Sequence, residues 1–128
     1  MQFKPPKNDD KYQWTNHVKG KMVYYGISES LIKRITRFPK RKEVGIATNT
    51  VAVMQSTSNK NKPQEVWVMF QPVGSGRTSN NKSPVFDFKQ NKIRIISAWR
   101  YPGVSPVGKT VPIPDEILQE LSNLIELA

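Results

Sequence analysis

The spacing of apolar residues changes once along this chain, and the change limits the folds available to it. Between residues 15 and 38, apolar side chains recur every three or four positions, which is typical of amphipathic helices. From residue 50 onward the chain contains runs of β-branched and aromatic residues, which are typical of strands. Helices followed by strands favour an α+β fold with a mainly antiparallel sheet over a doubly wound parallel one.

A first helix is expected over residues 15–25. Thr15 or Asn16 can serve as its N-cap, and Gly26 suits the left-handed position that ends a helix. Its buried face would consist of Val18, Met22 and Tyr25.

A second helix is expected over residues 28–38. Ser28 can cap it, Glu29 suits the positive end of the helix dipole, and Pro39 would stop it. Its apolar face would consist of Leu31, Ile32, Ile35 and Phe38.

Strands should follow the helices. The expected strands are TVAVMQ (50–55), EVWVMFQ (65–71) and KIRIISAWRY (92–101), with PVFDF (84–88) as a weaker fourth candidate. EVWVMF is apolar on both faces, which predicts a central strand. Strict alternation along the last strand would place Arg94 and Arg100 on the same face.

A final helix is expected over residues 115–127, opened by Pro114. Its apolar stripe would include Ile117, Leu118, Leu121, Leu124 and Ile125. This acidic helix could be the last packing element of the fold, or it could lie across a basic site and mask it.

The predicted organisation is therefore a flexible basic arm, residues 1–13, followed by a single α+β domain, residues 14–128. The domain should contain two N-terminal helices, a three- to four-stranded mainly antiparallel sheet and a C-terminal helix.

The charge distribution indicates a polyanionic partner. All twenty Lys and Arg residues lie at or before Lys109, and with six acids they give residues 1–111 a net charge of +14. The last seventeen residues contain four acids and no base. A strongly basic body is typical of proteins that bind nucleic acid, and we expect RNA rather than DNA. A membrane surface, an acidic protein or a solvated basic surface without a specific partner would explain the same composition.

Several classes of site are excluded by composition. Without cysteine the chain forms no disulfide and no thiolate metal site, and its one histidine rules out a multi-histidine site. The ten acids form no paired-carboxylate motif. We therefore expect a function that needs no metal and no cofactor. No segment has the length of a signal peptide core or a membrane span, so a cytoplasmic protein without membrane association is expected.

A resemblance to a known group of proteins makes the expected function more specific. The stretch containing His17, Lys21, Met22 and the Gly26-Ile27-Ser28 sequence, followed by a helix, resembles the opening of the small toxin-related domains of the BrnT and RelE type. The strand IISAWR resembles their closing strand, and the likeness covers roughly residues 14–101. This group, with barnase-like and colicin-like nucleases, implies metal-independent RNA cleavage and often an antitoxin-like partner protein.

Metal-free RNA cleavage requires a base, cations that stabilise the charged transition state, and an acid for the leaving oxygen. We assign His17 as the base, Lys21 as a phosphate contact, Arg100 as the transition-state stabiliser, and Tyr101 as the acid or a stacking residue. For each of these residues an ordinary structural role remains open, such as a surface histidine or a cation packed on an aromatic ring.

The remaining candidates would bind RNA without reacting with it. Tyr24 could stack on a base, and Arg94 and the loop residue Arg77 could contact phosphates. A run of cations should track the phosphate backbone or, alternatively, form a solvated surface: Lys33, Arg34, Arg37, Lys40, Arg41 and Lys42.

The predicted function is a small toxin-like ribonuclease. The alternatives are a non-catalytic nucleic-acid-binding module and a protein-interaction domain that docks an acidic partner.

Overall fold

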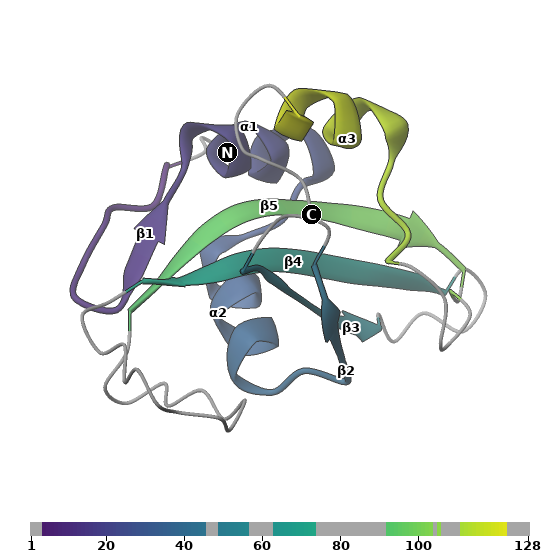
Figure 1. The fold of residues 1–128 in the computed structure, drawn as a ribbon, viewed down its shortest axis with the longest axis horizontal. Helices are drawn as coiled ribbons and strands as arrows, with labels where there is room; N and C mark the ends of the chain where they lie inside the picture. Colours follow the sequence, from purple (N-terminus) through teal and green to yellow (C-terminus); the bar gives the residue numbers. More distant parts are fainter. Residues whose placement is uncertain are drawn as a thin grey trace.

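The computed structural model describes residues 4–45, 49–56, 63–73, 92–103, 105 and 111–122. Its elements, in chain order, are β1 (Tyr12–Trp14), α1 (Asn16–Tyr25), α2 (Glu29–Arg37), β2 (Arg41–Val44), β3 (Val51–Ser56), β4 (Gln64–Val73), β5 (Lys92–Pro102) and α3 (Asp115–Ser122). In the view of Figure 1, α1 and α3 lie at the top and α2 lies near the bottom. The expected α+β class, with two N-terminal helices and a C-terminal one, is confirmed. The candidate strand PVFDF lies outside the described residues.

The two N-terminal helices begin and end where the capping residues predict. The Thr15 side chain accepts a hydrogen bond from the amide of Val18, and Ser28 accepts one from Leu31. Gly26 ends α1 with φ 68°, a left-handed conformation that glycine adopts without a steric cost.

Within the described residues the sheet has five strands and is mixed, so the expected three- to four-stranded, mainly antiparallel sheet had too few strands. The strand order is β1-β5-β4-β3-β2, in which β1 runs parallel to β5 and all other pairs are antiparallel. Both added strands are too short for a periodicity argument: β1 has three residues and β2 has four. The predicted central strand, β4, does lie in the middle of the sheet.

Strand β1 includes part of what the sequence assigned to a flexible arm. Tyr12 and Trp14 are 2% and 5% exposed and pack in the core. The segment before them is fixed by side chains that act as backbone caps, since Asp9 accepts hydrogen bonds from the amides of Lys11 and Tyr12. Asn8 accepts a third bond, from the amide of Trp14.

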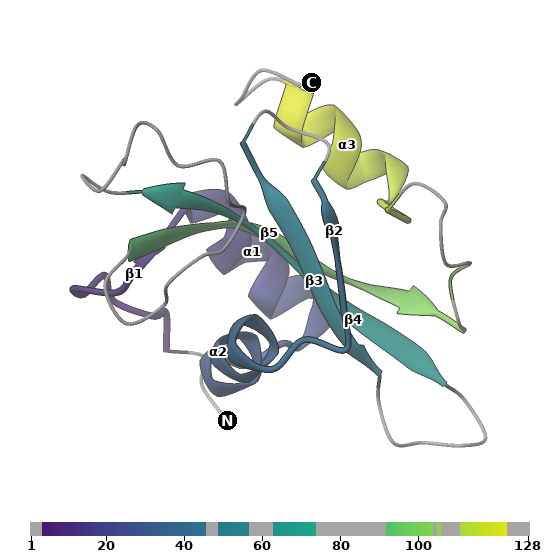
Figure 2. The ribbon, with the colours of Figure 1, turned by 60° about the horizontal axis from the view of Figure 1, so that its bottom comes forward.

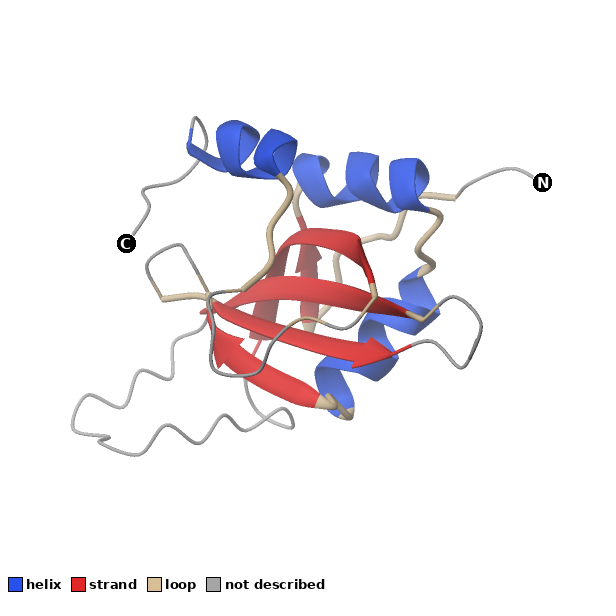
Figure 3. Cartoon of the chain, turned by 90° about the vertical axis from the view of Figure 1, so that its right-hand side faces the viewer, coloured by secondary structure: helices blue, strands red, loops and turns tan. Residues whose placement is uncertain are grey.

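Each face of the sheet is covered by different helices. On one face, apolar residues of β4 and β5, including Val68 and Ile95, pack with Val18 of α1 and Ile35 of α2. On the other face, Trp67 and Trp99 stack with ring centroids 6.3 Å apart and lie beneath Ile117 of α3. In the view of Figure 3, α1 and α3 lie at the top and α2 lies lower on the right.

Helix α1 also protects the edge of β5. Strand β1 pairs only with residues 93–95 of that strand. Beyond them, the Thr15 hydroxyl donates to the carbonyls of Ile95 and Ile96, and Arg100 bonds the other end of α1. Covering an open edge with a helix prevents unwanted strand pairing. It also holds the side chains of α1 beside those of β5.

A β-bulge in β5 corrects the predicted placement of its arginines. Met69 pairs with Ser97, but the next residue of β4, Phe70, pairs with Ile95, so Ile96 is an extra residue. The bulge inverts the alternation. Arg94 therefore shares a face with Ser97 and Trp99, while Arg100 lies on the opposite face.

Phe38 was assigned to the buried face of the second helix, and this was wrong: it is 71% exposed. Helix α2 ends at Arg37, and Phe38 has φ −133° and ψ 65°. Pro39 disfavours the helical conformation in the residue before it, so the chain leaves the helix and the ring leaves the core.

Among the described residues, no helix has the length and apolar character needed to cross a membrane.

Candidate functional site

His17 lies between three elements of the fold. Its Nε2 atom is 2.9 Å from the hydroxyl oxygen of Ser97 on β5, and its Nδ1 atom is 3.6 Å from a carboxylate oxygen of Glu120 on α3. The ammonium of Lys21, one turn along α1, is 2.9 Å from the same Glu120 oxygen. The structure thus brings His17 and Lys21 together, as the sequence predicted, and adds Ser97 and Glu120.

This His17 cluster (His17, Lys21, Ser97 and Glu120) is closed in the described conformation. The side chains of His17 and Lys21 are 7% and 13% exposed, and Ser97 is fully buried. Helix α3 is the cover, because Ile117 is buried in the apolar cluster of Trp67 and Trp99. A substrate would reach His17 only after α3 had moved.

Burial sets the charge state of His17. Loss of solvent lowers the pKa of the imidazole below its ordinary value, and the Lys21 ammonium lowers it further, against the opposing effect of the Glu120 carboxylate. A neutral imidazole is the form that a general base requires. At the other end of α1, burial and, to a smaller extent, the Glu116 carboxylate of α3 raise the pKa of Tyr25.

The other two residues assigned to catalysis lie away from His17. Arg100 donates hydrogen bonds to the carbonyls of Tyr25 and Gly26, at the opposite end of α1, about 12 Å along the helix axis. Tyr101 packs against the apolar cluster beneath α3, about 13 Å along β5 from Ser97. In this conformation Arg100 serves as a cap for the C-terminal carbonyls of α1.

Arg41, one of the predicted RNA contacts, is part of a buried polar network. Its guanidinium donates to the hydroxyl of Ser105 at 2.8 Å, pairs with Glu43 at 3.1 Å, and lies 3.9 Å from Glu65. Glu65 is 1% exposed and accepts hydrogen bonds from Ser105 and from the indole of Trp67. The network joins β2 and β4 to Ser105.

Two further predicted contacts are bound by neighbouring side chains. Lys33 pairs with Glu29 at 2.9 Å and lies over the ring of Tyr12. Arg94 donates to the side-chain oxygens of Gln13 and Gln71, across three strands of the sheet.

Tyr24 is 68% exposed, with the Lys21 ammonium 5.4 Å from its ring centroid. Arg77 lies outside the described residues.

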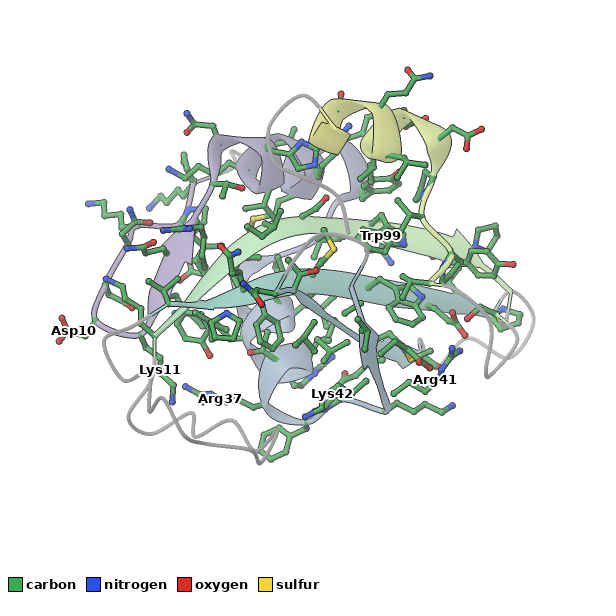
Figure 4. All side chains as sticks on the ribbon, viewed as in Figure 1. Asp10, Lys11, Arg37, Arg41, Lys42 and Trp99 are labelled. Atoms are coloured by element: carbon green, nitrogen blue, oxygen red, sulfur yellow. The ribbon has the colours of Figure 1, made fainter. Side chains whose placement is uncertain are left out.

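The remaining predicted cations form one exposed surface, which we call the α2–β2 strip. It consists of Arg34, Arg37, Phe38, Lys40 and Lys42, and all five side chains are exposed. In contrast to Lys21, Lys33 and Arg41, its four cations form no ion pair with any acid in the described part of the chain. Figure 4 shows Arg37 and Lys42 along the lower edge of the molecule.

The end of β3 holds the strip together. Gln55 accepts a hydrogen bond from Arg34 and donates one to the carbonyl of Phe38, while the Lys40 ammonium donates to the hydroxyl of Ser56. Lys42 pairs in register with Val53, which packs in the core shared with α2, so Lys42 points to the side of the sheet that carries α2. Figure 2 shows α2 beside β3 and β2.

Sequence reasoning missed Ser97, Glu120, Gln55 and the exposure of Phe38. Ser97 and Glu120 are far from His17 in the chain and carry no motif. Pro39 could have indicated the exposure of Phe38, because proline disfavours the helical conformation in the residue before it.

Comparison with known proteins adds no assignment. No protein-family model matches the chain, and neither the curated proteins nor the solved structures yield a match. The likeness to BrnT- and RelE-type domains thus rests on the quoted residues alone. Among the described residues, no group of three or more His, Cys, Asp or Glu side chains is positioned to hold a metal ion.

Proposed function

We propose that this protein binds RNA through the α2–β2 strip. The observation that carries the proposal is the set of four exposed cations, Arg34, Arg37, Lys40 and Lys42, that have no acidic partner among the described residues. Such cations gain free energy by neutralising phosphates and releasing the counterions of the nucleic acid.

The contrast with three of the other predicted site cations supports this choice. Elsewhere, Lys21, Lys33 and Arg41 are each paired with a carboxylate. An acidic protein, including an antitoxin-like one, would also be attracted to the strip. RNA is favoured because an exposed aromatic ring, Phe38, lies among the cations, and stacking aromatics with basic side chains are typical of RNA-binding surfaces.

Charge reversal tests the proposal. We expect Arg37→Glu and Lys42→Glu each to weaken binding of a mixed-sequence RNA about 5- to 20-fold at low salt, because each replaces a phosphate-binding cation with a repelling anion. Lys19→Glu is the matched control: it makes the same change in net charge on α1. Fluorescence anisotropy with a labelled 12-nucleotide RNA measures the affinities.

The control decides between a local and a global effect. Equal weakening by all three variants would indicate general attraction to a basic protein and contradict the proposal. Unlabelled DNA of the same sequence, used as competitor, measures the preference for RNA.

Metal-independent RNA cleavage is a second candidate, supported by the His17 cluster. A neutral imidazole and an ammonium lie within one turn of each other, as a general base and a phosphate contact would. Helix α3 would have to move first. The test is cleavage of RNA in EDTA by the wild type, His17→Ala and Glu120→Gln. Cleavage that His17→Ala abolishes and Glu120→Gln increases would support it, and no cleavage by the wild type or Glu120→Gln would count against it.

A further inference from the structure

Phe38 is an apolar residue that stays exposed although it directly follows a helix packed on the core. Phe38 is 71% exposed, whereas Ile35, one turn earlier on α2, is fully buried. Exposing an apolar side chain forgoes roughly 1.5–3 kcal/mol of burial. A partner that covers the ring would recover part of this free energy.

The backbone that carries the ring is fixed. The amide of Phe38 donates to the carbonyl of Arg34 at 2.9 Å, and its carbonyl accepts from the Gln55 side chain at 2.8 Å. The ring is thus presented from an anchored position, which lowers the entropic cost of a contact with it.

Phe38 differs from the other exposed aromatic residue that the structure describes. Tyr24 contacts Tyr25 edge-to-face at 4.8 Å between centroids and lies beneath the Lys21 ammonium. Phe38 makes no ring or cation contact with the described residues. No described aromatic or cationic side chain therefore competes with a ligand for this ring.

The neighbours of the ring define the chemistry of that ligand. Arg37 precedes Phe38, Lys40 follows two residues later, and Arg34 bonds the same Gln55 side chain that holds the Phe38 carbonyl. A planar apolar group flanked by anions fits this arrangement. An unpaired nucleotide has a base and two flanking phosphates, whereas the bases of a duplex are stacked inside the helix.

We propose that the α2–β2 strip is specific for single-stranded RNA, with one unpaired base stacked on Phe38 and the flanking phosphates held by its cations. This inference rests on the proposed RNA binding and adds the conformation of the ligand. It assigns to Phe38 the stacking role that the sequence suggested for Tyr24.

The test compares a single strand with a duplex. The probes are a 12-nucleotide RNA without self-complementarity and the same RNA annealed to its complement. Phe38→Leu keeps an apolar side chain but removes the ring, Phe38→Trp keeps a stacking ring, and Tyr24→Leu is the control at an exposed aromatic on α1. Thermal unfolding checks that each variant is folded.

We expect Phe38→Leu to weaken single-strand binding about 5- to 100-fold while changing duplex binding less than about twofold. Phe38→Trp should bind the single strand at least as well as the wild type, and the emission of its added exposed indole should be quenched by that strand. Tyr24→Leu should change neither affinity more than about twofold.

The outcomes separate the two proposals. If Arg37→Glu and Lys42→Glu weaken binding but Phe38→Leu does not, or weakens single strand and duplex equally, the strip contacts phosphates only and the single-strand inference fails. If the charge reversals also have no effect, the proposed function fails with it.

Discussion

At the scale of single residues, the contacts of His17 show which parts of a site can be predicted from the sequence and which cannot. The sequence placed His17 and Lys21 on one side of a helix, which is where they lie. It gave no indication that Ser97, eighty residues away, would bond the ring, or that Glu120 would pair with Lys21. Contacts between distant residues follow from the assembled fold and have no local pattern in the sequence.

The buried imidazole should make stability depend on pH. Because its pKa is lowered in the folded state, the unfolded chain binds a proton that the folded chain does not, between the lowered pKa and about 6.5. The free energy of unfolding should therefore fall as the pH falls through this window. In His17→Gln, that part of the pH dependence should be absent from urea unfolding curves. Parallel pH profiles for the wild type and the variant would contradict the assignment.

The neighbours of His17 should shift its pKa in opposite directions. Removing the carboxylate in Glu120→Gln should lower the pKa further, since that group raises it, and Lys21→Met should raise it. Titration of the ring protons by NMR measures both changes. Shifts of the same sign in the two variants would show that Lys21 and Glu120 do not act on the ring as described.

At the scale of elements, β2 shows why neighbouring cations need not share a function. Arg41 pairs in register with Met54 and Lys42 with Val53, so their side chains point to opposite faces of the sheet. Arg41 joins the buried network of Glu65 and Ser105, whereas Lys42 is exposed on the strip. The sequence grouped them as one run of cations because the four residues of β2 carry no strand signal.

Replacing Arg41 with methionine should mainly lower stability, whereas replacing Lys42 with methionine should mainly weaken RNA binding. Arg41→Met should lower the free energy of unfolding by about 2–3 kcal/mol, because it leaves the buried Glu65 carboxylate without its cation. Lys42→Met should leave stability within about 0.5 kcal/mol and weaken RNA binding. Urea unfolding and anisotropy measure the two effects. Similar losses of stability in both variants would contradict this division.

The long elements were predictable and the short or irregular ones were not. Strong periodicity and caps gave α1, α2 and the three long strands to within about two residues. The bulge at Ile96 was invisible because it depends on how β5 pairs with β4. Of the candidate site, the sequence supplied the basic residues, but only the fold shows which of them remain exposed and unpaired.

At the scale of the whole molecule, opposite charges are separated across the sheet. The acidic helix α3 packs on the face of the sheet that carries Trp67 and Trp99, whereas the α2–β2 strip lies on the face that carries α2. Helix α3 therefore covers the His17 cluster but not the strip. Of the two expected roles of the C-terminal helix, packing is confirmed, since Ile117 is buried in the core. Masking of a basic site stays a prediction, for which the contact between Glu120 and Lys21 is the structural support.

This separation predicts how salt affects binding. If four cations each neutralise one phosphate of a single strand, the slope of log K against log salt concentration should be about −3. Lys42→Met should reduce its magnitude by about 0.7, and Glu120→Gln should leave it unchanged. Anisotropy titrations at several salt concentrations give these slopes. A slope near zero would show that phosphates contribute little to binding.

The most direct test of the central claim is to map the RNA contact on the folded protein. Amide chemical shifts should be recorded by NMR while a 12-nucleotide single-stranded RNA is added to the wild type. We expect little change at His17 and Lys21, and the largest changes at Arg34, Arg37, Phe38, Lys40, Lys42 and the adjoining Gln55. Changes concentrated around His17, Lys21 and Ser97, or no changes at saturating RNA, would contradict it.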